Sequence, residues 1–239
     1  KIPHQSSATG MQAIPTTGIA MGIQYREKTG MDQPASGTAP VVVCSLGDGS
    51  VTEGEVAEAF QMAVLKKMPI LYFIQDNEWD ISAHSKEIRA MDANEYAKGF
   101  NGLEVRSIDG TDFFTAYQTI QEILEIIRRE RRPFMLYAKV PLLGHHTSGV
   151  RREWYRHDLD EHQKRDPFPK FRKQLLESGF NDAELDRIFE SSRALVEADF
   201  NRALNAEDPR PEDLFNYDYA PTPIREEKGE REAEIGRAH

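Results

Sequence analysis

Cysteine is almost absent from this sequence, with Cys44 as the single example among 239 residues. One thiol cannot form a disulfide framework or a cysteine-based metal cluster within the chain. Cys44 lies in the apolar run VVVCSL, from which we expect a buried and unreactive side chain. Disulfide-stapled domains and cysteine-ligated metal sites are therefore excluded.

An excess of basic residues is also missing, since 30 lysines and arginines face 40 aspartates and glutamates. The formal net charge of −10 argues against broad binding to nucleic acids or anionic membranes. No apolar stretch approaches the roughly 18–20 residues that a membrane span needs, and no signal peptide is visible. We therefore expect a cytoplasmic chain. Both ends resemble internal sequence, so we also expect it to be part of a longer protein.

Short apolar, β-branched runs alternate with helical patterns over the first part of the chain. Such alternation predicts an α/β fold, a parallel β-sheet flanked by helices. Buried strands are expected at 41–46, 70–75, 103–109 and 133–140, and helices at 12–25, 53–67 and 113–131.

The C-terminal part has a different character. Residues 139–167 are polar, rich in His and Arg, and long for a connection without regular structure, which is typical of a functional or mobile loop. Helical patterns follow at 168–178 and 182–204. We expect a domain over 1–205 and an acidic linker or extended arm over 206–239.

Gly47-Asp48-Gly49 directly follows the first expected strand. In open parallel sheets, ligands bind beyond the C-terminal ends of the strands, where the next helix offers its N-terminus. The glycines allow a tight turn, and the N–H groups of Gly49 and Ser50 would face an anion. Asp48 would repel a phosphate unless a divalent cation lies between them, and Mg²⁺ prefers such oxygen ligands.

Asp76-Asn77 occupies the same place after the second strand. Asn77 offers an amide oxygen, and the loop NEWDIS offers a backbone carbonyl. A Gly-Asp-Gly sequence alone is more often a simple tight turn. The matching positions of both polar ends around one strand–helix–strand unit favour a Mg–diphosphate site.

These two ends together resemble the thiamine diphosphate motif. The stretch GDGSVTEGEVAEAFQMAVLKKMPILYFIQDNEWDIS resembles the alpha chains of 2-oxo acid dehydrogenases, the decarboxylating first component of the pyruvate and branched-chain complexes. It departs from their pattern at Asp76, which is usually Asn, and in having Trp79 rather than Tyr or Phe. The resemblance implies thiamine diphosphate and Mg²⁺, with Asp48, Asn77 and the carbonyl of Trp79 around the metal. The cofactor-binding residues expected in this unit are Gly47, Asp48, Gly49, Ser50, Gln75 and Asn77.

Two further segments match in order. HQSSATGMQAIPTTGIA resembles the Ser/Gly-rich helix entry of the family, so Ser7 and Thr9 would border the aminopyrimidine ring. GHHTSG resembles the Gly-His-His loop, so His146 aligns with the catalytic histidine and would also border the cofactor. An isolated His pair is otherwise a surface feature. As a neutral imidazole, His146 would orient the substrate carboxylate and relay protons to the lipoyl acceptor. The resemblance covers about residues 1–205.

Three arginines follow the histidine pair in the same loop. Arg151, Arg152 and Arg156 would either hold the loop against an anion or form a solvated basic patch. The residue types and their spacing fit both interpretations equally.

The activity implied by the resemblance is decarboxylation of a 2-oxo acid and transfer of the acyl unit to a lipoyl group on an acyltransferase component. QDNEWDIS and GHH favour a branched-chain substrate, such as 2-oxoisovalerate, over pyruvate or an acetoin-type substrate. The family completes its site with a beta region, fused or separate, of which no segment is visible here. The chain alone is therefore expected to bind the cofactor weakly and to be inactive. A non-catalytic assembly half and a transketolase-like enzyme are the alternatives.

Overall fold

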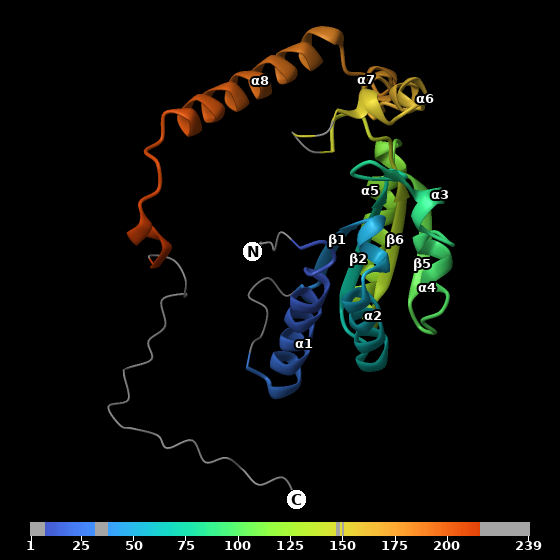
Figure 1. Ribbon diagram of the computed structural model, residues 1–239. Coiled ribbons are helices and arrows are strands. Elements are labelled where there is room, and N and C mark those ends of the chain that lie inside the picture. Colours follow the sequence, from blue (N-terminus) through green and yellow to red (C-terminus); the bar gives the residue numbers. More distant parts are fainter. Residues whose placement is uncertain (1–7, 32–37, 147–148, 150, 216–239) are drawn as a thin grey trace, which may run out of the picture. The chain divides into compact units, whose positions relative to one another are not determined.

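The computed structural model describes residues 8–31, 38–146, 149 and 151–215 (Figure 1). The chain divides into two compact units, Lys1–Asn181 and Asp182–His239. The first unit holds the sheet and every site residue that the sequence predicts. The predicted limits of 1–205 and 206–239 stay a prediction.

A four-stranded sheet forms the centre of the first unit. Its order is β1 (Val42–Gly47), β2 (Ile70–Asp76), β6 (Phe134–Lys139) and β5 (Glu104–Asp109), and all three neighbouring pairs are parallel. The four strands fall where the apolar runs predicted them. All four C-terminal ends therefore meet at one edge of the sheet, which confirms the predicted fold class.

Helices cover both faces of this sheet. Helices α1 (Ala13–Thr29), α2 (Gly54–Lys66) and α4 (Ala93–Ala97) contribute buried residues to the hydrophobic core on one face. Helix α5 (Phe113–Glu130) packs on the other through Ile123 and Ile127 (Figure 1). The pattern of two covered faces explains why the central strands are almost continuously apolar.

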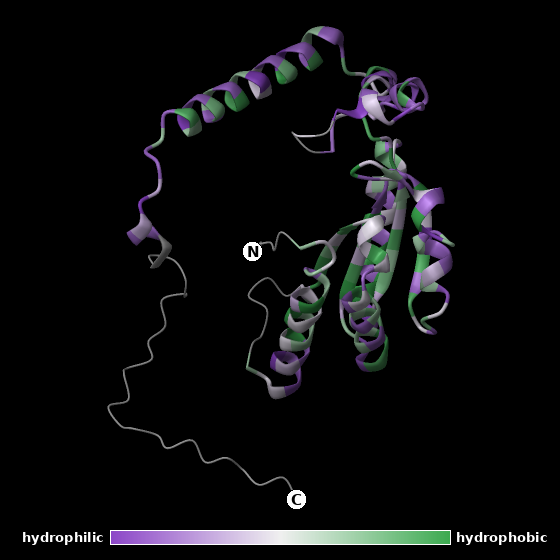
Figure 2. Cartoon of the chain, viewed as in Figure 1, coloured by the Kyte–Doolittle hydropathy of each residue, from purple (hydrophilic) through white to green (hydrophobic). Residues whose placement is uncertain are grey.

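Side chains alternate between the two cores along each central strand. In β2, Tyr72 and Ile74 belong to the core under α1 and α2, whereas Leu71 belongs to the core under α5. Hydrophobic colouring accordingly runs along the strands in Figure 2. Cys44 is 2% exposed within the first of these cores, and burial raises the pKa of its thiol, which confirms the predicted buried cysteine.

The residues at the helix ends explain where these helices begin and end. Gly30 ends α1 in the left-handed conformation, with φ of 68°, which glycine adopts without a Cβ penalty. Lys67 takes the same conformation after α2, with φ of 50°, just before the chain enters β2. Asp112 begins α5 by accepting a hydrogen bond from the Thr115 backbone N–H at 2.9 Å.

Short elements surround the C-terminal edge of the sheet. They are η1 (Gly49–Thr52), the antiparallel pair β3 (Trp79–Asp80) and β4 (Ala83–His84), α3 (Ser85–Ile88), η2 (Arg152–Trp154), α6 (Leu159–Lys164) and α7 (Pro167–Glu177). The expectation that 139–167 lacks regular structure was therefore wrong, because η2 and α6 fall inside it. Both are short, and α6 lacks a clear apolar repeat.

The second unit contains α8 (Asp182–Leu204) and η3 (Pro211–Phe215). Helix α8 matches the predicted range and leaves most of its apolar side chains exposed, including Phe189, Leu195 and Phe200. No helix among the described residues is long and apolar enough to cross a membrane.

Candidate functional site

Two buried carboxylates lie side by side where β1 and β2 end. The parallel register pairs Gly47 with Gln75, so Asp48 and Asp76 are the next residues along each strand. Asp48 is 2% exposed and Asp76 is 5% exposed. Burial first, and then the charge of Asp76, raises the pKa of Asp48 to about 7. Two carboxylates at this position make a site that attracts positive charge.

Arg89 is the buried cation of this cluster. It lies just beyond α3, and one guanidinium nitrogen donates to Asp48 Oδ2. The side chains of Arg89 and Asp48 are 4% and 2% exposed. Tyr137, on β6, donates its hydroxyl to Asp76 Oδ2. The hydroxyl carries no charge, so one guanidinium faces two carboxylates.

The cluster has the chemistry of a divalent cation site. When both acids are ionised, two carboxylates and one guanidinium leave one negative charge in excess, and burial makes this imbalance costly, which is why the pKa of Asp48 rises to about 7. Mg²⁺ binds through one or two protein carboxylates and takes its remaining oxygen ligands from phosphate and water. No group of three His, Cys, Asp or Glu residues able to hold a metal occurs in the part of the chain that the structure describes. The two carboxylates therefore fit a cation that takes its remaining oxygen ligands from phosphate or water.

Asn77 lies one residue beyond the position opposite Asp48. The register places Asp76 beside Asp48, whereas Asn77 Oδ1 accepts a hydrogen bond from the Trp79 backbone N–H at 2.9 Å. Asp76 Oδ1 similarly accepts from the Glu78 N–H at 2.9 Å. The two side chains shape the exit from β2, and the remaining lone pair of the Asn77 amide oxygen can still serve a metal.

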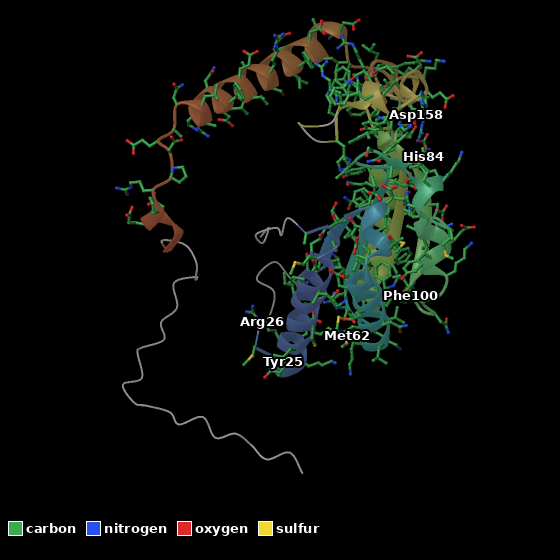
Figure 3. All side chains as sticks on the ribbon, in the orientation of Figure 1. Tyr25, Arg26, Met62, His84, Phe100 and Asp158 are labelled. Carbon is green, nitrogen blue, oxygen red and sulfur yellow. The ribbon has the colours of Figure 1, made fainter. Side chains whose placement is uncertain are left out.

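Trp79 connects the end of β2 to the loop that follows β6. It is 7% exposed, and its indole N–H donates to Asp158 Oδ2 at 2.7 Å. The His84 ring contacts the same indole, with 4.9 Å between ring centroids. His84 and Asp158, two of the partners of this indole, are labelled in Figure 3. Arg156 lies over the indole, 5.3 Å from its centroid, and its Nε donates to Asp158 Oδ1 at 2.8 Å.

His162 completes this network from α6. Its Nδ1 accepts from the Leu142 backbone N–H at 2.9 Å, and its Nε2 lies 3.0 Å from Asp158 Oδ2. Burial and the neighbouring Arg156 lower the pKa of His162. Burial acts against the Asp158 carboxylate, but hydrogen bonds from Arg156 and Trp79 outweigh it and lower the pKa of Asp158. The loop is therefore tied to Trp79 by the indole hydrogen bond to Asp158 and by the Arg156 guanidinium over the ring, and the Arg156–Asp158 ion pair and the His162 contacts hold the loop itself together.

His146 lies in this same loop and is exposed. Its neighbour His145 accepts a hydrogen bond from the Arg152 backbone N–H at 3.3 Å through Nδ1. The Arg156 side chain is 0% exposed, so the prediction of a solvated basic patch was wrong for this residue. It pairs with Asp158 inside the protein, because the folded loop covers it. The catalytic role of His146 stays a prediction.

The other predicted residues lie around the turn after β1, except Ser7, which falls outside the described residues. Gly49 and Ser50 are buried in η1, whereas Gly47 is exposed at the end of β1. Gln75 is exposed on β2, with Oε1 at 3.5 Å from Ser45 Oγ. Thr9 is exposed in the turn that enters α1, and this turn approaches the sheet edge because Gly10 packs against Glu53.

A cavity of about 250 Å³ opens beside the acid pair. Asp76, Tyr137 and Lys139 line it from the strand ends, and Arg89 lines it from the segment after α3. The Nε and Nη1 atoms of Arg89 are buried and have no hydrogen-bond partner among the described residues. Because buried guanidinium groups are normally fully paired, Arg89 keeps unused donor capacity next to this cavity.

Sequence reasoning missed three members of the cluster: Asp76, Arg89 and Tyr137. Asp76 was predicted to lie at the polar end of the second strand, but it was given no role there and was otherwise noted as a departure from a family pattern. Arg89 lies 41 positions from Asp48, in a segment without a motif. Only the folded chain brings these residues together.

The chain matches a known protein family over most of its length. The family described as Dehydrogenase E1 component matches residues 1–212. The chain is 29% identical over 207 residues to the pyruvate dehydrogenase E1 component subunit alpha of Rickettsia bellii, covering 84% of this chain and 60% of that protein. It is 29% identical over 196 residues to the human mitochondrial 2-oxoisovalerate dehydrogenase subunit alpha, covering 79% and 44%. The chain thus spans about 60% of the length of the first of these relatives.

A transketolase from Campylobacter jejuni is similar at 21% identity and a TM-score of 0.47, over 54% of this chain and 20% of that one. A likeness of that extent carries no argument about function. The family match covers residues 1–212 and so includes the acid pair, Trp79 and the His146 loop. The chain belongs to the Dehydrogenase E1 component family.

Proposed function

We propose that this chain is the alpha region of a thiamine diphosphate-dependent 2-oxo acid dehydrogenase. The observation that carries the proposal is the buried pair Asp48–Asp76 beside a glycine turn, which carries one negative charge in excess when both acids are ionised. The excess charge suits a Mg²⁺ ion that bridges the protein to the diphosphate. Thiamine diphosphate would supply, when bound, the thiazolium ring that accepts the electron pair released by decarboxylation.

The residues of this chain bind and orient the cofactor. Asp48 offers a carboxylate oxygen to the metal, and Asn77 and the Trp79 carbonyl are the further ligands that we propose. Gly47, Gly49 and Ser50 form the turn that faces the diphosphate, because residues with little or no side chain permit close backbone approach. Gln75 and Thr9 lie on exposed surface near the same edge and would border the rest of the cofactor.

His146 is proposed as the group that meets the substrate. Its exposure in a loop tied down through Asp158 suits a side chain that must reach both a 2-oxo acid and an incoming lipoyl arm. A neutral imidazole can donate to the substrate carboxylate from one nitrogen and accept a proton at the other. The contacts among Arg156, Asp158 and His162 restrict the motion of the loop, while the His146 side chain stays exposed.

The partners that we propose are a beta region, fused or separate, and a lipoyl-bearing acyltransferase component. The family supplies the glutamate that activates the aminopyrimidine from the beta region. The fragment alone should therefore bind Mg²⁺ and thiamine diphosphate weakly and should not turn over. Robust decarboxylation by these 239 residues alone would contradict this proposal.

The test compares three variants of the complete enzyme with a dye or lipoyl acceptor. Asp48→Ala should abolish turnover and cofactor binding, because the metal loses its carboxylate. His146→Ala should retain cofactor binding and lose acyl transfer. Glu125→Gln, an exposed change on α5, should behave like the unmodified enzyme. Normal cofactor binding by Asp48→Ala would refute the assigned site, and normal turnover by His146→Ala would remove that residue from the mechanism.

For the substrate, we propose a branched-chain 2-oxo acid such as 2-oxoisovalerate. The support is the sequence QDNEWDIS at the end of β2 and the GHH loop. Both a pyruvate and a 2-oxoisovalerate relative are 29% identical to this chain, so overall similarity does not separate the two substrates. Equal values of kcat/KM on pyruvate and 2-oxoisovalerate would overturn this choice.

A further inference from the structure

The carboxylate of Asp80 fills the space directly in front of Gly49. A Cβ placed on Gly49 would lie 1.9 Å from Asp80 Oδ1 and 2.0 Å from Oδ2. Such distances are far below van der Waals contact, so the acid lies flat against the glycine backbone. Gly49 is therefore the residue that lets an anionic group approach the turn after β1. In this structure that group is the Asp80 carboxylate.

Among the residues that the structure describes, Asp80 has no charge partner at this position. No hydrogen bond or ion pair to its carboxylate occurs among the described residues. The buried cation of this cluster, Arg89, donates to Asp48 instead. An unpaired carboxylate next to the acid pair adds to an existing excess of negative charge. Its position is therefore electrostatically unfavourable unless a cation is nearby.

The backbone around Asp80 is also strained. Ile81 has φ of 40° and Glu78 has φ of 68°, both in the left-handed region that glycine favours. For a β-branched residue such as Ile81 this conformation is a clear outlier, and such strain often marks ligand clamps. The surrounding contacts therefore maintain a strained backbone in the hairpin of β3 and β4, and this backbone presents Asp80 to Gly49.

The hairpin is fixed at its base and free at its tip. Trp79 is buried and donates to Asp158, and the Ser85 backbone N–H donates to the Glu78 carbonyl at 2.8 Å. Ile81 at the tip is 47% exposed. Rotation of the partly buried Asp80 side chain toward solvent therefore needs no change in the base of the hairpin.

We infer that Asp80 is an internal anion that occupies the place of a diphosphate oxygen and is displaced when the cofactor binds. This inference rests on the proposed function, since it assigns the diphosphate to the Gly49 turn. Displacement makes Asp80 a determinant of cofactor affinity. A carboxylate and a diphosphate repel each other, whereas a divalent cation attracts both, so Asp80 also increases the dependence of cofactor binding on metal.

The test measures binding by calorimetry and by tryptophan fluorescence in the complete enzyme. Its probes are Mn²⁺ alone, inorganic pyrophosphate with Mg²⁺, and thiamine diphosphate with Mg²⁺. Asp80→Asn removes the charge at constant size, and Asp80→Ala removes the group. Both should tighten binding of the two diphosphate probes about tenfold, as expected for removal of one nearby like charge. Binding of Mn²⁺ alone should weaken by no more than about tenfold, as expected for loss of one nearby charge that is not a ligand. Every affinity should stay unchanged in the control Glu125→Gln.

The outcomes separate this inference from the proposed function. If the unmodified enzyme binds thiamine diphosphate and both Asp80 variants bind it equally or more weakly, the inference fails and the proposed function stands. A loss of Mn²⁺ affinity of more than about a hundredfold in Asp80→Asn would also overturn the inference, because it would make Asp80 a metal ligand. If neither the enzyme nor any variant binds a diphosphate probe, both are wrong.

Discussion

Replacing Arg89 with Met should expose the electrostatic imbalance of the acid pair. Arg89 and Asp48 form an ion pair with side chains only 4% and 2% exposed. Removing one partner of such a buried pair costs about 3–5 kcal/mol, because the other charge stays buried without compensation. Here Asp76 adds a second carboxylate, so the variant should lose at least about 3 kcal/mol of unfolding free energy at pH 8.

Magnesium should then replace the missing cation. Saturating Mg²⁺ should raise the unfolding free energy of Arg89→Met by at least about 1 kcal/mol more than that of the unmodified protein. Urea unfolding followed by tryptophan fluorescence measures both quantities. The matched control is Arg106→Met, whose ion pair with Glu122 is 33% and 50% exposed and should contribute less than about 1 kcal/mol.

Two results would refute this reasoning. A loss below about 1 kcal/mol in Arg89→Met would mean that the ion pair contributes no more than one on the surface. Equal stabilisation of both proteins by Mg²⁺ would mean that the ion does not bind next to Asp48. Either result would remove the charge argument for a metal at the ends of β1 and β2.

Three further predictions concern residues around this edge. Gly49→Ala should fold, because only the movable Asp80 carboxylate must shift, but should lose at least about tenfold in thiamine diphosphate affinity by calorimetry. Trp79→Phe removes the indole donor to Asp158 and should cost about 1–3 kcal/mol in urea unfolding, while Mn²⁺ binding, which uses the backbone carbonyl, stays unchanged. Asp112→Ala should cost about 1 kcal/mol at neutral pH, as loss of a helix cap does. Hydrogen bonds from the Thr115 backbone N–H and from Lys170 lower the pKa of Asp112. Its contribution is therefore present above the unfolded pKa of about 3.9 and is lost as pH falls through the lower folded pKa. Stability differences that do not shrink in acid would contradict this assignment.

The helices and strands of the first unit follow closely from local sequence. The apolar runs at VVVCSL and ILYFIQ became β1 and β2, and the amphipathic stretch 113–131 became α5, within a residue or two. Such elements are predictable because burial on both faces requires continuous apolar strands, whereas a one-sided helix requires a 3.6-residue period. The short hairpin at Trp79–His84 and helix α6 escaped prediction, because neither has enough residues to show a period.

The sequence predicted where the polar ends of the first two strands lie, but it did not predict every residue that meets there. Gly-Asp-Gly and Asp-Asn do end adjacent parallel strands, as their positions after apolar runs indicated. The partner of Asp48 across the strands is Asp76, however, because the register pairs Gly47 with Gln75. A shift of one residue in register cannot be deduced from apolar runs that are buried on both faces, since neither face distinguishes the two alignments.

The sequence by itself determined a parallel α/β sheet, the polar ends of its first two strands, and the family to which the chain belongs. These features depend on hydrophobic pattern and on contiguous motifs, which are local properties of the chain. Tertiary structure alone decided that Arg89 pairs with Asp48, that Trp79 supports the His146 loop through Asp158, and that Asp80 covers Gly49. The first two of these contacts join residues 41 and 79 positions apart, and only chain packing brings such distant residues within hydrogen-bonding distance.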